Sequence, residues 1–301
     1  MPTTYDIIES NIRKTAFLIA LFFILIIGLG WYISWWQDSP AILVLAVIFS
    51  IAMSFLSFWH SDKIVLSITG AREIKKEDMP FLYRIVENLS IASGLPIPRI
   101  YLIDDLAPNA FATGRDPKHS AIALTSGLLE KLEKSEIEGV VAHEMSHIQN
   151  RDTLIATLVV VLVGFVIILA DWFLRMGFWQ GGGRRSRQGG NLGIILGLLG
   201  FIFIILSPII ARVIQFSVSR KREFLADGSA SLMTRYPEGL ARALEKISQD
   251  QTKSKYKSPA LAHLYIVNPF RGKERNNWLN KLFSTHPPIK ERIEILRNMN
   301  L

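Results

Sequence analysis

Cysteine is absent from the 301 residues of this chain. No disulfide framework is therefore possible, and any bound metal must be held by histidines and carboxylates. The absence is compatible with a reducing compartment without requiring one. Half of the residues are hydrophobic and the mean hydropathy is positive. A soluble protein has more polar residues than this, so the composition points to segments that cross a membrane.

Two long runs near the N-terminus contain no charged residue. Thr15 to Trp36 is 22 residues long and Ala41 to Trp59 is 19 residues long. Each can cross a hydrocarbon core of roughly 30 Å, and the short linker Gln37–Pro40 makes them a tight hairpin. No A-x-A-like cleavage site ends the first run, which argues against a removed signal peptide. Tryptophans lie near the run ends, as in an aromatic belt: Trp31, Trp35, Trp36 and Trp59.

Two further apolar runs occur later in the chain. They are Thr153 to Ala170 and Asn191 to Ala211, and the Gly- and Arg-rich segment Gly181–Arg187 between them predicts a solvated loop. Their length and lack of charge favour membrane insertion. The alternative is a buried hairpin within a folded core.

Lysine and arginine positions predict the orientation. Arg13 and Lys14 precede the first run and four basic residues follow the second, whereas the linker between them carries only Asp38. The N-terminus and the main polar region are therefore expected in the cytoplasm of a multi-pass cell (inner or plasma) membrane protein. The loop after the third run opposes this because it carries Arg175, Arg184, Arg185 and Arg187. Early spans usually set orientation, so we expect the second pair to cross as well.

Residues 251–301 hold ten Lys and Arg against three Asp and Glu, a net charge of +7. Such a segment is either a solvated basic face or a surface attracted to anionic lipid headgroups. Because the chain carries no nucleic-acid motif and is tethered to a membrane, we expect the lipid bilayer as its polyanionic partner and no nucleic acid.

The stretch His143–His147 has the sequence H-E-x-x-H within a segment of helical apolar spacing. Histidines at i and i+4 project from one helix face and can both bind one Zn²⁺. Glu144 between them can then take a proton from water at the metal. Ser135 to Glu138 reads S-x-x-E and predicts a capping box at the helix start. The alternative is an amphipathic surface helix with two solvated histidines.

A third ligand is expected from the segment that follows the fourth apolar run. Glu223 and Asp227 stand at i and i+4 in a stretch without Pro or Gly, so they share a helix face. Glu223 can complete the zinc site, and Asp227 can accept a hydrogen bond from a ligand histidine and fix its tautomer. Alternatively, both acids pair with Arg220 and Lys221 on a solvated face.

Between the apolar runs the pattern is α+β and mostly helical. Asp78 to Ser93 has helical spacing, and Arg99–Ile103, Asn109–Gly114 and Ala121–Thr125 are short strands of a small sheet. We expect a four-span transmembrane helical part with a cytoplasmic zincin-type metalloprotease domain. Its divisions are an N-terminal hairpin (1–62), a zincin domain with the H-E-x-x-H helix (63–152), a second hairpin (153–211) and a helical remainder (212–301).

With these motifs the chain resembles the HtpX-type membrane zinc metalloproteases, gluzincins related to the type I CAAX prenyl endopeptidases. Ser284–Pro288, with the sequence S-T-H-P-P, extends the resemblance when followed by Glu291 and Arg292. The likeness covers essentially the whole chain. Four spans point to the HtpX branch, because the CAAX enzymes have more.

The resemblance implies an endopeptidase that cleaves damaged or misassembled membrane proteins at the cytoplasmic face. It implies one Zn²⁺ per chain on His143, His147 and Glu223, with Glu144 as general base and later proton donor. A non-catalytic membrane scaffold with a structural metal site and a CAAX-type prenyl-protein processing protease are the alternatives.

Further roles follow from the same resemblance. His286 is expected to hydrogen-bond the oxyanion of the tetrahedral intermediate, or else is a turn histidine before two prolines. Arg292 is expected to support the site through a carboxylate. The segment Pro108–Gly114 matches the edge strand that holds a substrate backbone, which makes substrate-binding residues of Asn109, Ala110, Phe111 and Ala112.

Overall fold

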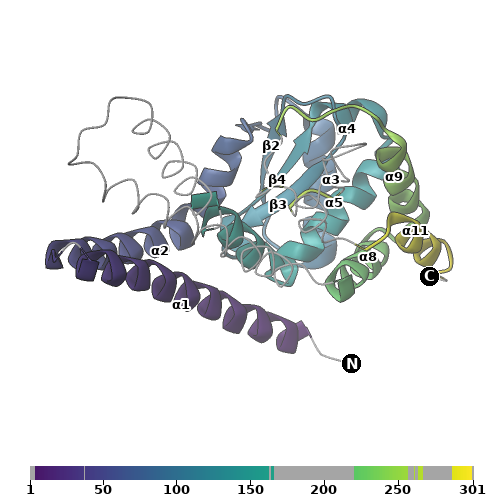
Figure 1. Cartoon of the computed structure of the whole chain (residues 1–301). Helices are drawn as coiled ribbons and strands as arrows, with labels where there is room; N and C mark the ends of the chain where they lie inside the picture. The colour runs from purple at the N-terminus through teal and green to yellow at the C-terminus, as the bar shows by residue number, and fades with distance from the viewer. Residues whose placement is uncertain are drawn as a thin grey trace.

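The computed structural model of the chain describes residues 4–36, 38–162, 164–165, 220–256, 261, 264–266 and 287–299. In these ranges a long helical hairpin leads into a body built from a small sheet and several helices (Figure 1). The predicted fourth apolar run, 191–211, lies outside the described residues.

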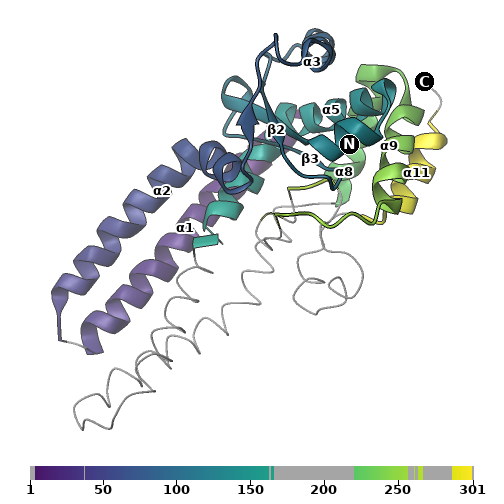
Figure 2. The ribbon, with the colours of Figure 1, turned by 90° about the horizontal axis from the view of Figure 1, so that it is seen from above.

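The hairpin consists of α1 (Thr4–Trp36) and α2 (Pro40–Ile68), which lie side by side and extend away from the body (Figure 2). Pro40 begins α2 at a position where its missing N–H costs no helical hydrogen bond. Both helices are long and apolar enough to cross a membrane. Large apolar side chains along them are exposed, which suits helices surrounded by lipid: Phe17, Ile24, Trp31, Val44, Ile48, Ile51 and Phe55. The two N-terminal spans predicted from the sequence thus form helices of sufficient length and hydropathy.

The third apolar run begins as a helix, Asp152–Leu162, which is shorter than a membrane span. Its side chains pack against the first helix, with Ile155, Leu158 and Val159 buried beside Leu18 and Phe22 of α1. This contact joins the membrane hairpin to the chain that leaves the predicted metal helix. The rest of the run is mostly outside the described residues.

The sheet has four strands in the order β1-β2-β4-β3. β2 (Arg99–Ile103) and β4 (Ser120–Thr125) are parallel, whereas β1 (Arg72–Glu73) and β3 (Ala110–Gly114) pair antiparallel at the two edges. The three predicted strands are confirmed to within one residue. β1 was not predicted, because two residues are too few to show alternation.

Both faces of the sheet are covered. One set of alternating side chains packs on α3 (Pro80–Ser93), α5 (Lys134–Gln149) and α9 (Pro237–Gln249): Ile100, Ala110, Ala112, Ile122 and Leu124. The other set packs against the end of α2 and against Leu261, Leu264 and Tyr265: Tyr101, Ile103, Phe111, Ala121 and Ala123. A strand turns successive side chains to opposite faces, so each strand contributes to both cores. The first core holds α5 against the sheet.

The start of α5 differs from the sequence prediction. A capping box is present, but it is made by Glu133 and Glu136 rather than by Ser135 and Glu138. The Glu136 carboxylate accepts from the Glu133 backbone N–H at 2.8 Å and from Lys246 Nζ of α9 at 2.8 Å. The predicted box was therefore wrong by two residues. The local sequence allows a capping box at either Glu133 or Ser135. The buried contact of Glu136 with Lys246 of α9 favours the first.

The α5 and α9 backbones approach closely because glycines lie at their contact. A Cβ atom added at Gly139 would lie 2.7 Å from the Leu240 backbone nitrogen, and one at Gly239 would lie 2.6 Å from the Ser135 carbonyl oxygen. Both distances are shorter than any side chain tolerates. These two glycines therefore set the position of α5 relative to the C-terminal helices.

We predict that Gly139→Ala lowers the melting temperature of the purified protein. The added methyl group meets α9 backbone, so the helices must separate, at a cost of about 1–3 kcal/mol. Differential scanning fluorimetry in detergent measures the effect. Gly228→Ala is the matched control, since its Cβ meets nothing closer than Met299 at 4.0 Å. That change should be neutral or stabilising, and equal melting temperatures for the two variants would contradict the packing argument.

Candidate metal centre

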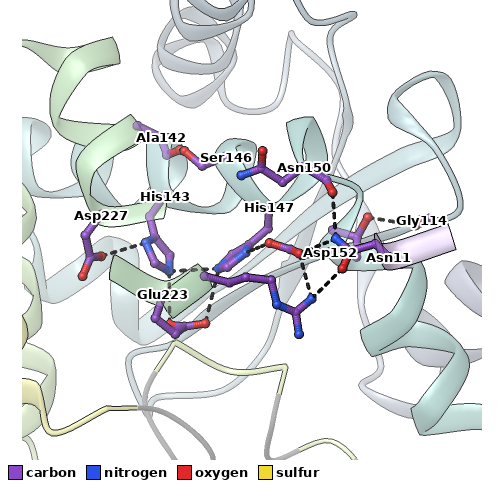
Figure 3. A network of polar contacts seen from close by, with 12 residues as sticks. Asn11, Gly114, Ala142, His143, Ser146, His147, Asn150, Asp152, Glu223 and Asp227 are labelled. Carbon is purple, nitrogen blue, oxygen red and sulfur yellow. Dashed lines mark hydrogen bonds and ion pairs between the residues drawn. The ribbon is translucent and has the colours of Figure 1, made fainter. Parts of the chain in front are cut away.

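His143 and His147 lie on one face of α5 with their rings turned toward each other (Figure 3). Their Nε2 atoms are 3.2 Å apart and the rings are perpendicular. The i, i+4 spacing predicted this shared face. The His143 side chain is fully buried, whereas that of His147 keeps 16% of its surface exposed. The pair therefore forms the inner part of a partly open site.

Glu223 comes from α8 (Arg220–Thr234), which packs against α5. Its carboxylate oxygens lie 3.8 Å from His143 Nε2 and 3.6 Å from His147 Nε2. The three donor atoms lie within 4.8 Å of one another. Tetrahedral Zn²⁺ with bond lengths of about 2.0–2.2 Å separates its ligand atoms by roughly 3.4 Å. The donor types and their spacing therefore fit a metal ion of this kind.

Each histidine is held from behind by a carboxylate. Asp227 Oδ1 lies 3.0 Å from His143 Nδ1, and Asp152 Oδ2 lies 3.0 Å from His147 Nδ1. Figure 3 shows the two acids on opposite sides of the ring pair. A carboxylate at Nδ1 fixes the proton there and leaves the Nε2 lone pair for a metal. Asp227 thus lies beside His143, as the sequence predicted, whereas the position of Asp152 was not predicted.

Asp152 reaches back to His147 because the chain turns sharply after α5. Arg151 adopts a left-handed conformation with φ 57°, which ends a helix more often at Gly or Asn. Two groups from distant elements hold the other oxygen of Asp152: Asn11 Nδ2 of α1 and Arg222 Nη1 of α8, both at 2.8 Å. In the sequence, the one feature that could have pointed to this role of Asp152 is its position five residues after His147.

Arg292 binds Asp227 from the C-terminal helix α11 (Ile289–Arg297). Its Nε and Nη2 donate to the two carboxylate oxygens at 2.8 and 2.7 Å. Nη1 also lies 3.4 Å from Glu223 Oε2. The arginine is completely buried. It therefore contacts the carboxylate as expected and ties the end of the chain to the histidine pair.

Glu144 is buried between the histidines and the edge strand. Burial raises the pKa of its carboxyl group, and the nearby Glu223 adds to this rise. The two histidines and a hydrogen bond from the Ala112 backbone oppose the rise without cancelling it. The result is a carboxylate with an increased proton affinity beside the three donor atoms.

The surroundings of the site favour a positive charge at its centre. Burial opposes the charged imidazole, but Asp152, Glu223 and Glu144 together raise the pKa of His147 to about 9. Burial likewise opposes the charged form of Asp152 and Asp227, yet their histidine and arginine partners lower the pKa of both. A cation held by these carboxylates suits this field, which supports the metal-binding interpretation.

The predicted substrate segment forms β3, the last strand in the sheet order, but its residues are buried and face different ways. Ala112 donates to Glu144, whereas the Ala110 carbonyl accepts from the Ile266 backbone at 3.2 Å. Phe111 points to the opposite face and packs edge-on against Tyr265. Asn109 precedes the strand and pairs with Thr125 of β4. His286, the expected oxyanion partner, lies outside the described residues.

Comparison with known proteins gives a consistent family. The family model "Peptidase family M48" matches residues 77–300. A "Protease HtpX homolog" of Dictyoglomus turgidum is 43% identical over 99% of this chain and 95% of the relative. A protein of the same name from Caldanaerobacter subterraneus is 42% identical over 99% of both chains, and one from Pyrococcus furiosus is 43% identical over 95% of both.

Among solved structures, the crystal structure of S. mikatae Ste24p aligns with 97% of this chain and 67% of that chain, at 19% identity and a TM-score of 0.47. The family match and the near full-length relatives carry the assignment. The chain is a metalloprotease and belongs to peptidase family M48.

Proposed function

We propose that this chain is a zinc-dependent endopeptidase with one Zn²⁺ per chain, which cleaves membrane proteins at the cytoplasmic face of the cell membrane. The observation that carries the proposal is the convergence of His143 Nε2, His147 Nε2 and Glu223 within 4.8 Å, with Glu144 buried beside them. A structural metal site has no need of this fourth group. Its position therefore supports catalysis over a non-catalytic scaffold.

When Zn²⁺ is held by this group, it supplies a Lewis acid that polarises a carbonyl and lowers the pKa of water toward about 7. Glu144 accepts the proton of the attacking water and then delivers it to the leaving amine. Its raised pKa suits the first step, because a base with a higher proton affinity takes the proton more readily. No side chain of the site forms an acyl-enzyme in this scheme.

Carboxylates and arginines keep the ligands oriented. Asp227 and Asp152 hold the two rings, and Arg292 holds Asp227. By resemblance to the family, His286 donates to the oxyanion of the tetrahedral intermediate. A turn histidine is the alternative for that position.

The substrate is proposed to lie extended along the outer edge of β3. This strand is at the end of the sheet order and its backbone at Ala112 contacts Glu144, so a bound peptide would replace the hydrogen bond that the Ala110 carbonyl accepts from Ile266. A peptide added to such an edge is held by main-chain hydrogen bonds and presents its carbonyls in register. The arrangement suits substrates that are locally unfolded, including damaged or misassembled membrane proteins. A CAAX-type enzyme would instead cleave a prenylated peptide in preference to an unmodified one.

We predict that Glu144→Gln abolishes most proteolysis while the metal is retained. The amide cannot accept a proton, and loss of general acid–base catalysis costs about 10²–10⁴-fold in rate. Zinc content by elemental analysis and cleavage of casein by the detergent-purified protein are measured together. Glu138→Gln on the same helix is the matched control and should keep full activity. Undiminished cleavage by the Glu144 variant would refute its role as the base.

We predict that Asp152→Asn and Asp227→Asn each weaken zinc binding. Both remove the negative charge behind a ligand histidine, and such changes typically cost about 10–100-fold in metal affinity or activity. Competition with a chromogenic chelator measures the affinity. Asp104→Asn is the control, because this exposed acid lies away from the histidines and pairs with Lys255 at the surface. An unchanged affinity in both site variants would show that neither acid orients a ligand.

We predict the topology from cysteine labelling, for which the cysteine-free chain gives no background. Asp38→Cys in the α1–α2 linker should react with a membrane-impermeant maleimide on intact cells. Lys75→Cys, beyond α2, should react only after permeabilisation. Ser186→Cys tests the second hairpin and is expected to react from outside. Labelling of position 75 on intact cells would reverse the proposed orientation.

A further inference from the structure

A basic pocket lies where α2 meets the sheet, away from the metal centre. Its volume is about 680 Å³. One wall comes from the end of α2, with Phe55, Trp59, His60, Asp62 and Lys63. The other comes from β2 and the β3–β4 connection, with Arg99, Arg115, Lys118 and His119. Figure 1 shows this end of α2 reaching the body beside β2.

Positive charge dominates the lining. Lys63, Arg99, Arg115 and Lys118 face a single lining carboxylate, Asp62, which already pairs with Arg99 at 2.6 Å. Within the part of the chain that the structure describes, neither Lys63 nor Lys118 forms an ion pair. Asp116, just outside the lining, is shared by His119 at 2.8 Å and Arg115 at 3.4 Å. The pocket therefore keeps a surplus of cations without their own acids.

The apolar wall continues into an exposed stripe on α2. Ile48, Ile51, Phe55 and Trp59 follow helical spacing on one face, and their exposures are 58%, 56%, 59% and 42%. Trp59 stands at the end of the apolar run, where tryptophan favours the membrane–water interface. The stripe therefore runs from the apolar part of the helix directly into the basic pocket.

Arg115, which lines the pocket, contacts Trp59 at the end of this stripe. Its guanidinium lies 4.4 Å from the centre of the Trp59 ring, and its Nη1 donates to the Trp59 carbonyl at 3.3 Å. A guanidinium stacked on an aromatic ring keeps its remaining N–H groups in a fixed plane, which suits the oxygens of a phosphate. Cations and an aromatic boundary thus occupy one site.

We propose that this pocket binds the phosphate headgroup of an anionic phospholipid, whose acyl chains lie along the α2 stripe. Lys63, Lys118 and Arg115 bind the phosphate and the charged headgroup, and Phe55 and Trp59 contact the first methylenes. Charge selects anionic over zwitterionic lipid. The apolar stripe selects a lipid over a soluble phosphate, because inorganic phosphate gains nothing from it.

Lipid in this pocket would also act on the edge strand. β3 ends at Gly114, next to Arg115, and the Gly114 carbonyl accepts from Thr153 at 2.9 Å. A bound headgroup would hold the β3–β4 connection and with it the strand that contacts Glu144. This consequence for catalysis rests on the proposed function, whereas the binding site itself does not.

The test measures binding separately from activity. Full-length Glu144→Gln protein in neutral detergent is titrated with short-chain phosphatidylglycerol, phosphatidylcholine or inorganic phosphate, and dissociation constants are determined by microscale thermophoresis. Lys63→Ala combined with Lys118→Ala should weaken phosphatidylglycerol binding about 25-fold, since each cation near an anionic lipid contributes a factor of roughly five. Both lysines are exposed, so the fold should be unaffected.

Lys253→Ala combined with Lys290→Ala is the matched control, with the same change in net charge within the basic C-terminal region. This control should change the dissociation constant for phosphatidylglycerol by no more than about twofold. Equal losses in the two double variants would overturn the pocket in favour of diffuse attraction. Equal affinity for phosphatidylcholine, or for inorganic phosphate, would overturn the anionic-lipid assignment. The proteolytic activity of the unmutated enzyme is then measured with and without lipid. If lipid does not raise this activity, the coupling to β3 is refuted but the binding site is not.

Discussion

The pairing of His143 and His147 with two buried carboxylates is the constraint on which the rest of the site depends. Each ring can point its Nε2 atom at a common centre only while an acid holds its Nδ1 atom. Those acids are themselves almost fully buried, so each needs further partners. Asp152 finds them in Asn11 and Arg222, and Asp227 finds its partner in Arg292. The side chains that orient the two rings therefore come from four helices: α1, the helix that begins at Asp152, α8 and α11.

This chain of partners explains why the membrane hairpin and the metal centre form one unit. Asn11 lies near the start of α1, just before the apolar run, and bonds to both the Asn150 carbonyl and Asp152. About two and three turns later, Leu18 and Phe22 pack on the helix that follows Asp152. A shift of α1 would therefore move Asp152 and change the orientation of the His147 ring. At the other end of the hairpin, Arg115 on Trp59 joins α2 to the end of β3.

The sheet places the edge strand β3 beside Glu144. β3 is outermost and shares a core with α5, so its backbone runs past Glu144 rather than above the ring pair. The close α5–α9 contact at Gly139 and Gly239 sets this position from the other side. Strand β3, Glu144 and the two histidines are thus positioned by packing on opposite faces of α5.

The sequence by itself determined the features that follow from a short repeat of side-chain types or from a long apolar run. The shared face of His143 and His147 follows from the helical repeat, the long helices α1 and α2 from their apolar length, and β2, β3 and β4 from local pattern. Tertiary structure decided which cap begins α5, because Glu136 is held by Lys246 of a distant helix. It also decided the roles of Asp152, Asn11 and Arg222. Those contacts require a left-handed turn at Arg151 and the docking of helices up to 211 residues apart, and no local pattern encodes where a buried charge finds its partner.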